Sequence, residues 1–579
     1  MFRGDPAHSG RYAGGGSAII GLQWRVPTDG DIVATPAVAN GLVYIGSGNG
    51  KMYAIDRSSG ATRWIFDAKS PIQSSAAVAG GAVYFASRDG IVHAIDASTG
   101  KSRWRVQTGR DLPLPWGHES GDLYVSSPAI VPGKVIIGSG DGFVYAVSPS
   151  SGGVLWKAKT GGRVRGTPAV ADGIVYAGSF DGRLYALDLS TGAERWRFDT
   201  QGVTLKSQDY GFDRRSIQSS PAVAGGTVFV GARDGFLYAV DARTGKLRWT
   251  YDHKVSWINS SPAVVGDVVY AGSSDAQFLQ AVDAASGKEL WRAKCDNTVW
   301  GSPVVAGDVI YWGDGSGVVH ASNRTNGAEL ASFRTGAQVH GSPVVDGNLL
   351  FIGSGDGNVY ALRLGDPAAA VKRAVFFDST YLRIAQVPNA AALSRYMADR
   401  GYALLRANEV ARFLEQRIQD RAPSVVVFAI DAVPDDALEP SPERSLMRRY
   451  LDAGGKIVWV GLPPAIWPVE PLKGERHGLN EIDWEAPNRL LGVSFADAIF
   501  DQRSARATDA GVRWGLPLRW RTGWSVAPAT VSEVLATDDL GLAGAWLKSY
   551  GGAPGTGFVR VPPDIPFSVY LASEYRPVK

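Results

Sequence analysis

A repeat of about 40 residues runs through residues 1–365 and limits the folds that this chain can adopt. Successive aromatic markers are separated by 40, 40, 52, 40, 53, 42 and 42 residues, and they are Trp24, Trp64, Trp104, Trp156, Trp196, Trp249, Trp291 and Phe333. A period near 40 is typical of propeller blades, because one four-stranded unit cannot bury both of its faces alone. The repeat therefore predicts eight units stacked around an axis.

Each unit carries the signals of four short strands. In residues 219–251, a Pro-Ala-Val segment, an alternating apolar run, an Asp-Gly hairpin and a Trp-bearing segment follow one another. Asp-Gly pairs form tight hairpins because glycine accepts a positive φ angle. The last unit supplies only three strands, whereas the strand-like piece at 21–26 has no unit of its own. We therefore expect an all-β eight-bladed propeller over residues 1–365, WD40-like in architecture, whose N-terminal strand closes the last blade.

A motif of the form Ala-x-Asp-x-x-x-Gly-x-x-x-Trp recurs within the units. Examples are AIDRSSGATRW (54–64), ALDLSTGAERW (186–196) and AVDARTGKLRW (239–249). The motif resembles the tryptophan-docking motif of the pyrroloquinoline quinone (PQQ)-like propeller repeat family. The resemblance implies that each tryptophan lies between adjacent blades, where a large apolar ring and an N–H donor are both useful.

This family contains enzymes as well as non-enzymatic proteins. Its quinoprotein dehydrogenases hold PQQ and a calcium ion at the propeller centre, and they often have a vicinal cysteine pair. The present chain has one cysteine, Cys295, and its repeats are close to the minimum length. It therefore resembles the compact BamB-like scaffold proteins of the bacterial envelope, and we expect neither a cofactor nor a metal ion.

One column of the repeat varies from blade to blade. When the units are aligned on Ser/Thr-Pro, the residue two positions earlier is mostly polar, whereas the residue between them is small throughout. We predict that this column lines one end of the channel and binds a small polar ligand through Gln73, Arg165, Gln218, Asn259, Trp300 and His340. Amides, a guanidinium and an indole suit such a ligand. The alternative is a solvated pore whose polar groups only hold water.

Two insertions account for the longer spacings in the repeat. They lie at 110–124 and 202–216, and both lead directly into the variable column, so both should rise on the same face of the ring. Loops on a regular scaffold frequently carry binding residues. The candidates within them are Trp116, His118, Glu119, Asp209, Tyr210 and Arg214.

The residues after 371 follow a different pattern. Apolar strands such as 371–379 and 422–431 alternate with amphipathic helices such as 408–421, for which Asn408 is the expected N-cap. This alternation predicts an α/β domain over 371–579, flavodoxin- or amidotransferase-like, with a parallel sheet.

A second resemblance concerns part of this domain. SVVVFAID (424–431) and RRYLDAGGKIVWVGLP (448–463) look like segments of the class I glutamine-amidotransferase-like fold. Enzymes of that fold use a nucleophilic cysteine with a histidine, but the only cysteine here belongs to the repeat region. The domain is therefore expected to be non-catalytic, with Asp378 at a strand end acting as a helix cap or lining a crevice.

Charge and hydropathy argue against nucleic-acid binding and against a membrane-spanning segment. Lys+Arg 59 against Asp+Glu 56 leaves a net charge of +3, which is too small for a nucleic-acid binder. No apolar run is long enough to span a bilayer. The opening MFRGDPAHSG lacks the features of an export signal. We expect a periplasmic or extracytoplasmic protein if a leader was removed before Met1, and otherwise a cytoplasmic one.

Two functions of different classes remain after these exclusions. The first is a non-enzymatic binding or scaffold protein whose propeller takes a protein partner or a small polar ligand. The alternative is a quinoprotein-type oxidoreductase, dependent on PQQ and calcium, that acts on alcohols or sugars and recruits acidic ligands from the inserted loops. A carbohydrate-directed enzyme that uses the second domain is the third possibility.

Overall fold

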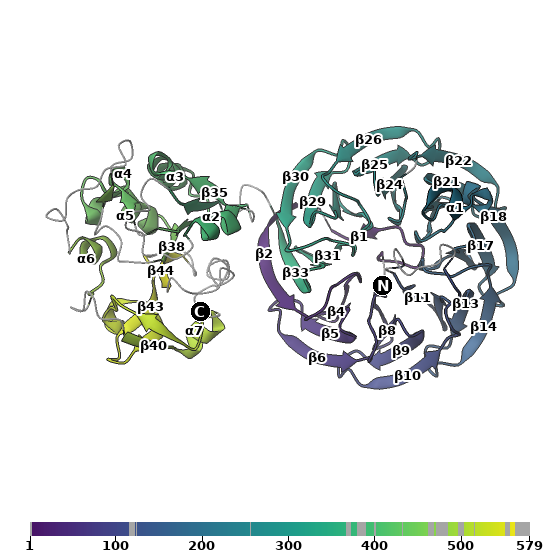
Figure 1. Ribbon diagram of the computed structural model, residues 1–579, viewed down its shortest axis with the longest axis horizontal. Coiled ribbons are helices and arrows are strands. Elements are labelled where there is room, and N and C mark those ends of the chain that lie inside the picture. The colour runs from purple at the N-terminus through teal and green to yellow at the C-terminus, as the bar shows by residue number, and fades with distance from the viewer. Residues whose placement is uncertain are drawn as a thin grey trace. The chain divides into compact units, whose positions relative to one another are not determined.

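The computed structural model divides into two compact units, Met1–Pro367 and Ala368–Lys579, each of which is described by itself (Figure 1). The structure describes residues 3–14, 16–114, 122, 124–254, 256–365, 372–378, 390–398, 401–430, 432–460, 468–469, 485–495, 503–514, 516–550 and 556–561. Among these residues, no helix is long and apolar enough to cross a membrane.

The first unit is a ring of antiparallel blades around a channel (Figure 1). The first four blades are β3 (Ala37–Ala39), β4 (Leu42–Gly46), β5 (Lys51–Asp56) and β6 (Thr62–Asp67); β7 (Ala77–Ala79), β8 (Ala82–Ala86), β9 (Ile91–Asp96) and β10 (Ser102–Gln107); β11 (Ala129–Val131), β12 (Lys134–Gly138), β13 (Phe143–Val147) and β14 (Val154–Lys159); β15 (Ala169–Ala171), β16 (Ile174–Gly178), β17 (Arg183–Asp188) and β18 (Glu194–Asp199). A short helix, α1 (Ser207–Tyr210), follows in the second insertion.

The remaining blades repeat the same order of strands. They are β19 (Ala222–Ala224), β20 (Thr227–Gly231), β21 (Phe236–Asp241) and β22 (Leu247–Asp252); β23 (Ala263–Val265), β24 (Val268–Gly272), β25 (Phe278–Asp283) and β26 (Glu289–Lys294); β27 (Val304–Ala306), β28 (Val309–Gly313), β29 (Val318–Asn323) and β30 (Glu329–Arg334); β31 (Val344–Asp346), β32 (Leu349–Gly353) and β33 (Asn358–Gly365), completed by β2 (Ala18–Pro27). The eight-bladed propeller predicted from the repeat is confirmed.

The two ends of the ring are joined in the last blade. Strand β2 pairs antiparallel with β33, with Trp24 opposite Ala361 and Pro27 opposite Asn358. Because β2 precedes the first blade and β33 ends the last one, this ladder of backbone hydrogen bonds closes the ring.

A tryptophan on an outer strand connects seven of the eight blades to the next one, whereas on β30 of the remaining blade Phe333 lies two positions beyond the equivalent place. The indole N–H of Trp64 donates to the carbonyl oxygen of Ala97 at 3.0 Å. The ring of Trp64 lies against Gly100, which has a φ of +71° and whose added Cβ would stand 2.8 Å from the ring. Glycine is needed here both for its backbone conformation and for its missing side chain. Equivalent indole bonds of 2.9–3.1 Å are made by Trp24, Trp104, Trp156, Trp196, Trp249 and Trp291.

This contact predicts a difference between two glycines that share a left-handed φ. Gly80→Ala should cost about 1 kcal/mol of unfolding free energy, because φ is +56° but no heavy atom lies within 4 Å of the new Cβ. Gly100→Ala should cost a further ~1–3 kcal/mol, since the methyl group collides with Trp64. Urea unfolding of both variants measures the difference, and equal losses would contradict the docking role of the glycine.

The second unit is built on one mixed sheet. The strand order is β35 (Ala403–Leu405), β34 (Lys372–Phe376), β36 (Ser424–Phe428), β38 (Lys456–Val460), β44 (Gly557–Val561), β43 (Ala543–Lys548), β42 (Glu533–Asp538), β40 (Arg503–Ala507) and β41 (Arg519–Thr522). The described helices are α2 (Ala390–Ala398), α3 (Ala407–Asp420), α4 (Asp435–Leu438), α5 (Leu446–Asp452), α6 (Ala486–Leu491) and α7 (Asp509–Arg513), beside the short pair β37 (Val433–Pro434) and β39 (Pro468–Val469).

The sheet differs from the expected one in that only half of it is parallel. From β35 to β44 the neighbours are parallel, in the chain order 2-1-3-4-5 that is also found in flavodoxin-like sheets. From β44 onwards the neighbours are antiparallel. The turn between β42 and β43 explains the antiparallel pairing of these two strands, because a four-residue connection allows only a hairpin, whereas a parallel crossover needs a dozen residues or more.

The first long helix of this unit is capped from the sheet. Helix α3 begins at Ala407, one residue before the predicted start, so Asn408 lies inside the helix and is not its N-cap. The carboxylate of Asp378, two residues beyond β34, accepts a hydrogen bond from the Ala407 N–H at 3.2 Å. Asp378 therefore satisfies one of the free N–H groups at the helix start.

Candidate functional site

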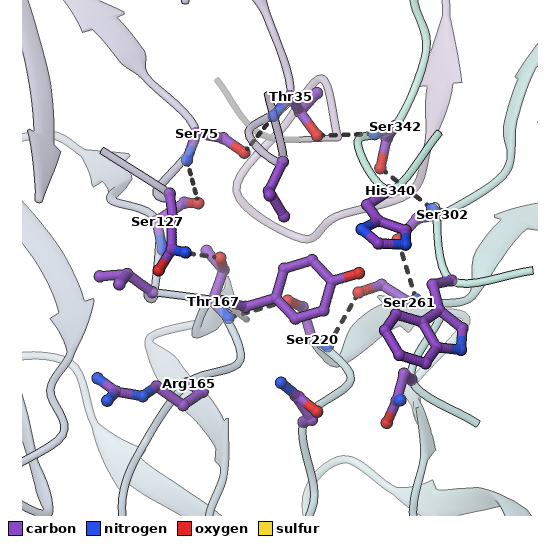
Figure 2. Close-up of a pocket in the computed structure, with 17 residues that line it drawn as sticks. Thr35, Ser75, Ser127, Arg165, Thr167, Ser220, Ser261, Ser302, His340 and Ser342 are labelled. Carbon is purple, nitrogen blue, oxygen red and sulfur yellow. Dashed lines mark hydrogen bonds between the residues drawn. The ribbon is translucent and has the colours of Figure 1, made fainter. Parts of the chain in front are cut away.

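A cavity opens at one end of the propeller channel (Figure 2). Its wall contains all six residues predicted from the variable column, namely Gln73, Arg165, Gln218, Asn259, Trp300 and His340. Val33, Val125 and Tyr124 also line it. The six residues of the alignment column thus line one cavity, and ligand binding by them stays a prediction.

A closed ring of hydroxyl groups surrounds the channel in this cavity (Figure 2). In every blade the backbone N–H of the ring residue donates to the hydroxyl oxygen of the ring residue in the next blade, over 2.8–3.2 Å. The ring residues are Thr35, Ser75, Ser127, Thr167, Ser220, Ser261, Ser302 and Ser342, and all of them are buried. The ring fixes the inner ends of the blades to one another.

The small residues that precede the ring are required by close approach of neighbouring blades. A Cβ on Gly301 would stand 2.8 Å from the carbonyl oxygen of Gly341, and one on Gly341 would stand 2.7 Å from that of Ala34. Where this position is serine, its hydroxyl faces the blade's own sheet, as Ser260 does when it accepts from Gly272 N–H at 3.2 Å. The column is small because the axis is crowded.

Trp300 and His340 form a stacked pair in the wall. Their ring centroids are 5.1 Å apart with an interplanar angle of 26°, and the indole N–H donates to Ser274 Oγ at 2.7 Å. Burial lowers the pKa of His340, while the charge of Asp31 opposes this shift. The imidazole is therefore neutral near pH 7, and the pair presents a flat surface held by hydrogen bonding.

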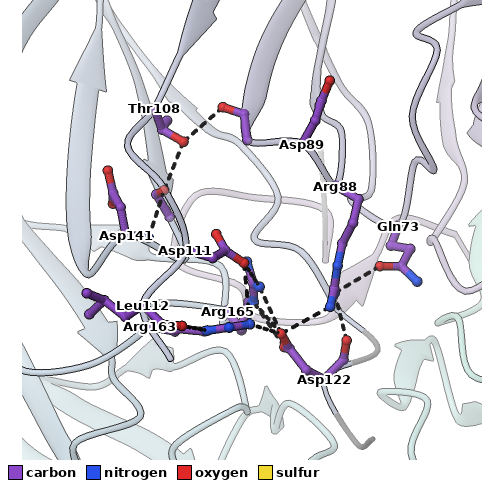
Figure 3. A network of polar contacts seen from close by, with 12 residues as sticks. Gln73, Arg88, Asp89, Thr108, Asp111, Leu112, Asp122, Asp141, Arg163 and Arg165 are labelled. Atoms are coloured by element: carbon purple, nitrogen blue, oxygen red, sulfur yellow. Dashed lines mark hydrogen bonds and ion pairs between the residues drawn. The ribbon is translucent and has the colours of Figure 1, made fainter. Parts of the chain in front are cut away.

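Arg165 lies in a buried ionic network and not as an isolated cation (Figure 3). Its guanidinium contacts Asp122 at 2.8 and 2.9 Å and also pairs with Asp111. Asp122 further accepts from Arg163 at 2.6 Å and from Arg88 at 3.3 Å. Burial opposes the charge on Asp122, but Arg165 and its neighbouring arginines lower the pKa of the carboxyl below its ordinary value. Both aspartates come from the first insertion, and their pairing with these arginines has no signal in the repeat.

The second insertion supplies a matching network. Asp213 pairs with Arg233 at 3.2 Å, and Arg233 donates to the amide oxygens of Gln218 at 2.5 Å and Asn259 at 3.4 Å. The guanidinium also lies 4.3 Å from the centroid of the Trp257 ring. Two of the predicted amides are therefore held in place by a buried arginine.

The described candidates within the insertions lie outside the cavity wall. Arg214 donates to the carbonyl oxygen of Asp234 and lies 5.3 Å from the Tyr210 ring. Asp209 and Tyr210 belong to α1 and are exposed, and none of these three residues lines the cavity. Trp116, His118 and Glu119 lie outside the described residues. Sequence reasoning did not select Tyr124, which lines the cavity with its hydroxyl buried and unpartnered, and whose pKa is raised by burial.

The N-terminal segment crosses the channel beyond the hydroxyl ring. Strand β1 (Arg11–Tyr12) pairs in parallel with β27 and lies inside the ring of blades (Figure 1). The carbonyl oxygens of residues 6, 7, 9 and 10 accept hydrogen bonds of 2.7–2.9 Å from Val170, Val223, Val264 and Val305, on four successive inner strands. These positions lie three residues after the ring residues, so the segment lies along four of the eight inner strands on the side away from the variable column.

No metal site accompanies these networks in the described part of the chain. There, no group of three or more His, Cys, Asp or Glu is arranged to hold an ion.

Comparison with known sequences decides the family. Residues 21–161, 140–278 and 276–367 match the PQQ-like repeat family described as outer membrane protein assembly factor BamB. The chain belongs to this BamB family. Residues 372–570 match the MJECL34 family, and this match does not show the predicted amidotransferase-like resemblance. Among curated proteins, none matches the sequence.

Solved structures of similar shape include BamB and quinoprotein enzymes. BamB from Moraxella catarrhalis is 24% identical, with a TM-score of 0.48 over 59% of this chain and 97% of its own. A europium-containing methanol dehydrogenase is 15% identical, with a TM-score of 0.53 over 63% and 97%. The quinohemoprotein alcohol dehydrogenase from Comamonas testosteroni is 16% identical, with a TM-score of 0.51 over 68% and 84%. At these identities the likeness shows the fold alone.

The network around Asp122 predicts a large and pH-dependent loss of stability. Asp122→Asn should cost about 3–5 kcal/mol of unfolding free energy, because it removes the buried carboxylate that Arg88, Arg163 and Arg165 share and leaves, among the described residues, only Asp111 beside two of them. The control Asp67→Asn removes an exposed partner of Lys69 and should cost at most about 1 kcal/mol. Because the pKa of Asp122 is lowered on folding, its contribution is complete above the unfolded pKa of about 3.9 and is lost as the pH falls. Urea unfolding from pH 7 to about pH 2 checks this, since the difference in stability between the wild type and Asp122→Asn should be constant above the unfolded pKa and should shrink below it.

Proposed function

We propose that this member of the BamB family is a non-enzymatic binding protein, with the propeller as its scaffold and the channel mouth as its binding site. The observation that carries this proposal is the cavity wall, in which hydroxyls, amides and an indole are already held by hydrogen bonds and an imidazole is stacked on the indole. Such preorganised polar groups around a concave site suit recognition of a small polar ligand.

The described residues fit a calcium-dependent quinone cofactor poorly. Calcium takes six to eight oxygen ligands and favours carboxylates. Among the residues described in the cavity wall, none is Asp or Glu, and the nearby Asp122 and Asp111 are engaged by arginines. The amide oxygens of Gln218 and Asn259 accept from Arg233. We therefore propose that neither PQQ nor calcium is a resident cofactor.

The family description favours a protein partner as the second kind of ligand. BamB is described as an assembly factor of outer membrane proteins. By that analogy we infer a place in the bacterial cell envelope and a partner bound at the rim of the propeller. The second domain would be a non-catalytic binding module, in keeping with the absence of any cysteine from residues 368–579. The alternative is a quinoprotein-type oxidoreductase, which the shared fold of the two dehydrogenases keeps open.

A thermal-shift screen tests the binding proposal. Neutral sugars, amino acids and nucleosides are titrated against the wild type and Trp300→Ala, which removes half of the stacked pair. We expect at least one compound to raise the melting temperature of the wild type and to bind Trp300→Ala about tenfold more weakly, since stacking is worth ~1 kcal/mol or more. Leu290→Ala, on an exposed outer strand, is the control and should respond as the wild type does.

The same protein preparation tests the alternative function. After incubation with PQQ and calcium, dye reduction is assayed with alcohols and sugars. The absence of dye reduction, together with a Trp300-dependent thermal shift, agrees with the proposal. PQQ-dependent turnover would overturn it.

A further inference from the structure

One histidine of the propeller lies between two carboxylates. His320 belongs to β29 and is 8% exposed. Its Nε2 atom lies 3.2 Å from Oδ2 of Asp314 in the hairpin before β29, and its Nδ1 atom lies 2.7 Å from Oε2 of Glu329, the first residue of β30. An ionised carboxylate only accepts hydrogen bonds, and only the imidazolium carries a hydrogen on both ring nitrogens. The geometry therefore favours a charged histidine at this place.

A second histidine has the same position in the repeat but different neighbours. His93 is the third residue of β9, as His320 is of β29. Its Nε2 atom lies 3.0 Å from the hydroxyl oxygen of Ser87, six residues earlier, where the other blade has an aspartate. Both imidazoles are stacked, His93 on Phe85 with ring centroids 4.8 Å apart and His320 on Trp312 at 3.9 Å. Among the described residues, only the site of His320 places carboxylates within hydrogen-bond distance of the ring.

The two environments shift the imidazole pKa in opposite directions. Burial lowers the pKa of His93 to about 4, and the charge of Asp89 opposes this shift only in part. Burial also acts against the charge of His320, but the hydrogen bonds to Asp314 and Glu329 outweigh it and raise the pKa above its ordinary value. The same scaffold position therefore holds a neutral histidine in one blade and an imidazolium in another.

The other groups around His320 leave this ion pairing intact. Ser316 donates to Oδ1 of Asp314 at 2.7 Å, and Ser332 donates to Oε1 of Glu329 at 3.0 Å, so neither hydroxyl occupies the oxygen that faces the imidazole. Cys295, which follows β26 in the adjacent blade, interacts with the charge of Asp314, but burial raises the pKa of its thiol to about 11 and keeps it neutral. In the described part of the chain, no other charged side chain lies within ion-pair distance of the imidazole.

Strand β30 also lacks the indole contact that joins the other outer strands to the next blade. Ala331 of β30 has the place opposite β29 that Trp291 has opposite β25. The neighbouring blade is the one that β2 closes, and β30 meets it through the apolar side chains of Ala331, Phe333 and Leu22. Within the described residues, the only ion pair made by β30 is that of Glu329 with His320.

We propose that Asp314, His320 and Glu329 form a proton-dependent clamp, which holds β30 in its blade at mildly acidic pH and releases it as the pH rises. Loss of the imidazole proton removes one charge-assisted hydrogen bond and leaves two carboxylates beside an uncharged ring. Because the pKa of His320 is raised on folding, its stabilisation is complete below the unfolded value of about 6.5 and is lost as the pH rises through the folded value. The junction between β30 and the ring-closing blade then has a local stability that depends on pH.

Hydrogen exchange followed by mass spectrometry tests the clamp, because it reports local opening of one strand. Protection factors of peptides from β30, corrected for the intrinsic pH dependence of exchange, are measured from pH 6 to pH 9. We expect protection of β30 to fall across this range in the wild type and to be low and constant in His320→Gln. Glu329→Gln, whose side chain is half-exposed, should also lose the pH response. Its matched control is Glu194→Gln, at the first position of β18 and 3.9 Å from Arg197, which should respond as the wild type does.

The two histidines supply a test of sign. In urea unfolding from pH 4.5 to pH 9, the stability difference between the wild type and His320→Gln should decrease as the pH rises above about 6.5. The difference between the wild type and His93→Gln should instead decrease as the pH falls below about 6.5, because the pKa of this histidine is lowered on folding. An equal pH response of β30 in the wild type and His320→Gln would overturn the inference, as would the same sign for both histidines.

Discussion

The contact between an outer-strand tryptophan and a glycine of the next blade is the interaction on which the propeller depends. It places the connection between blades at the outer strands, where Trp64 and Gly100 combine an indole hydrogen bond with close packing. Because this bond is made far from the axis, the inner ends of the blades need only one further fixed feature, the hydroxyl ring. The residue two positions before the ring is then free to differ in every blade. The same scaffold can therefore carry Gln73 in one blade and His340 in another.

The repeat made the fold and most of the cavity predictable from sequence. When blades share one geometry, an alignment column corresponds to a ring in space, which is why residues as distant in sequence as Gln73 and Trp300 could be assigned to one cavity. The prediction did not extend to features that occur once. Asp122 and Tyr124 come from an insertion without a period, and their partners are fixed only by the fold. In the second domain, the hairpin from β42 to β43 shows the same limit, because a turn of a few residues reverses the strand direction.

The insertions also determine whether the charge of Arg165 is available to a ligand. Arg165 was expected to offer its charge to a ligand, but Asp122 and Asp111 neutralise it within the protein. Arg233 likewise pairs with Asp213, and it also donates hydrogen bonds to Gln218 and Asn259. The loops thus act as charge compensation for arginines at the start of the blades. Asp111, Asp122 and Asp213 are therefore each paired with an arginine inside the protein.

Each ring hydroxyl provides an acceptor that the scaffold requires and a donor that the scaffold does not require. In the second unit Ala76 replaces the proline of the Ser/Thr-Pro segment, yet Ser75 is still present. The scaffold requires an acceptor at this position for the N–H of the neighbouring blade, and a hydroxyl is the smallest side chain that supplies one. A hydroxyl acceptor brings a donor with it, so closing the ring necessarily places eight O–H groups around the axis. Because these groups line the cavity, water or a polar ligand in it can satisfy them.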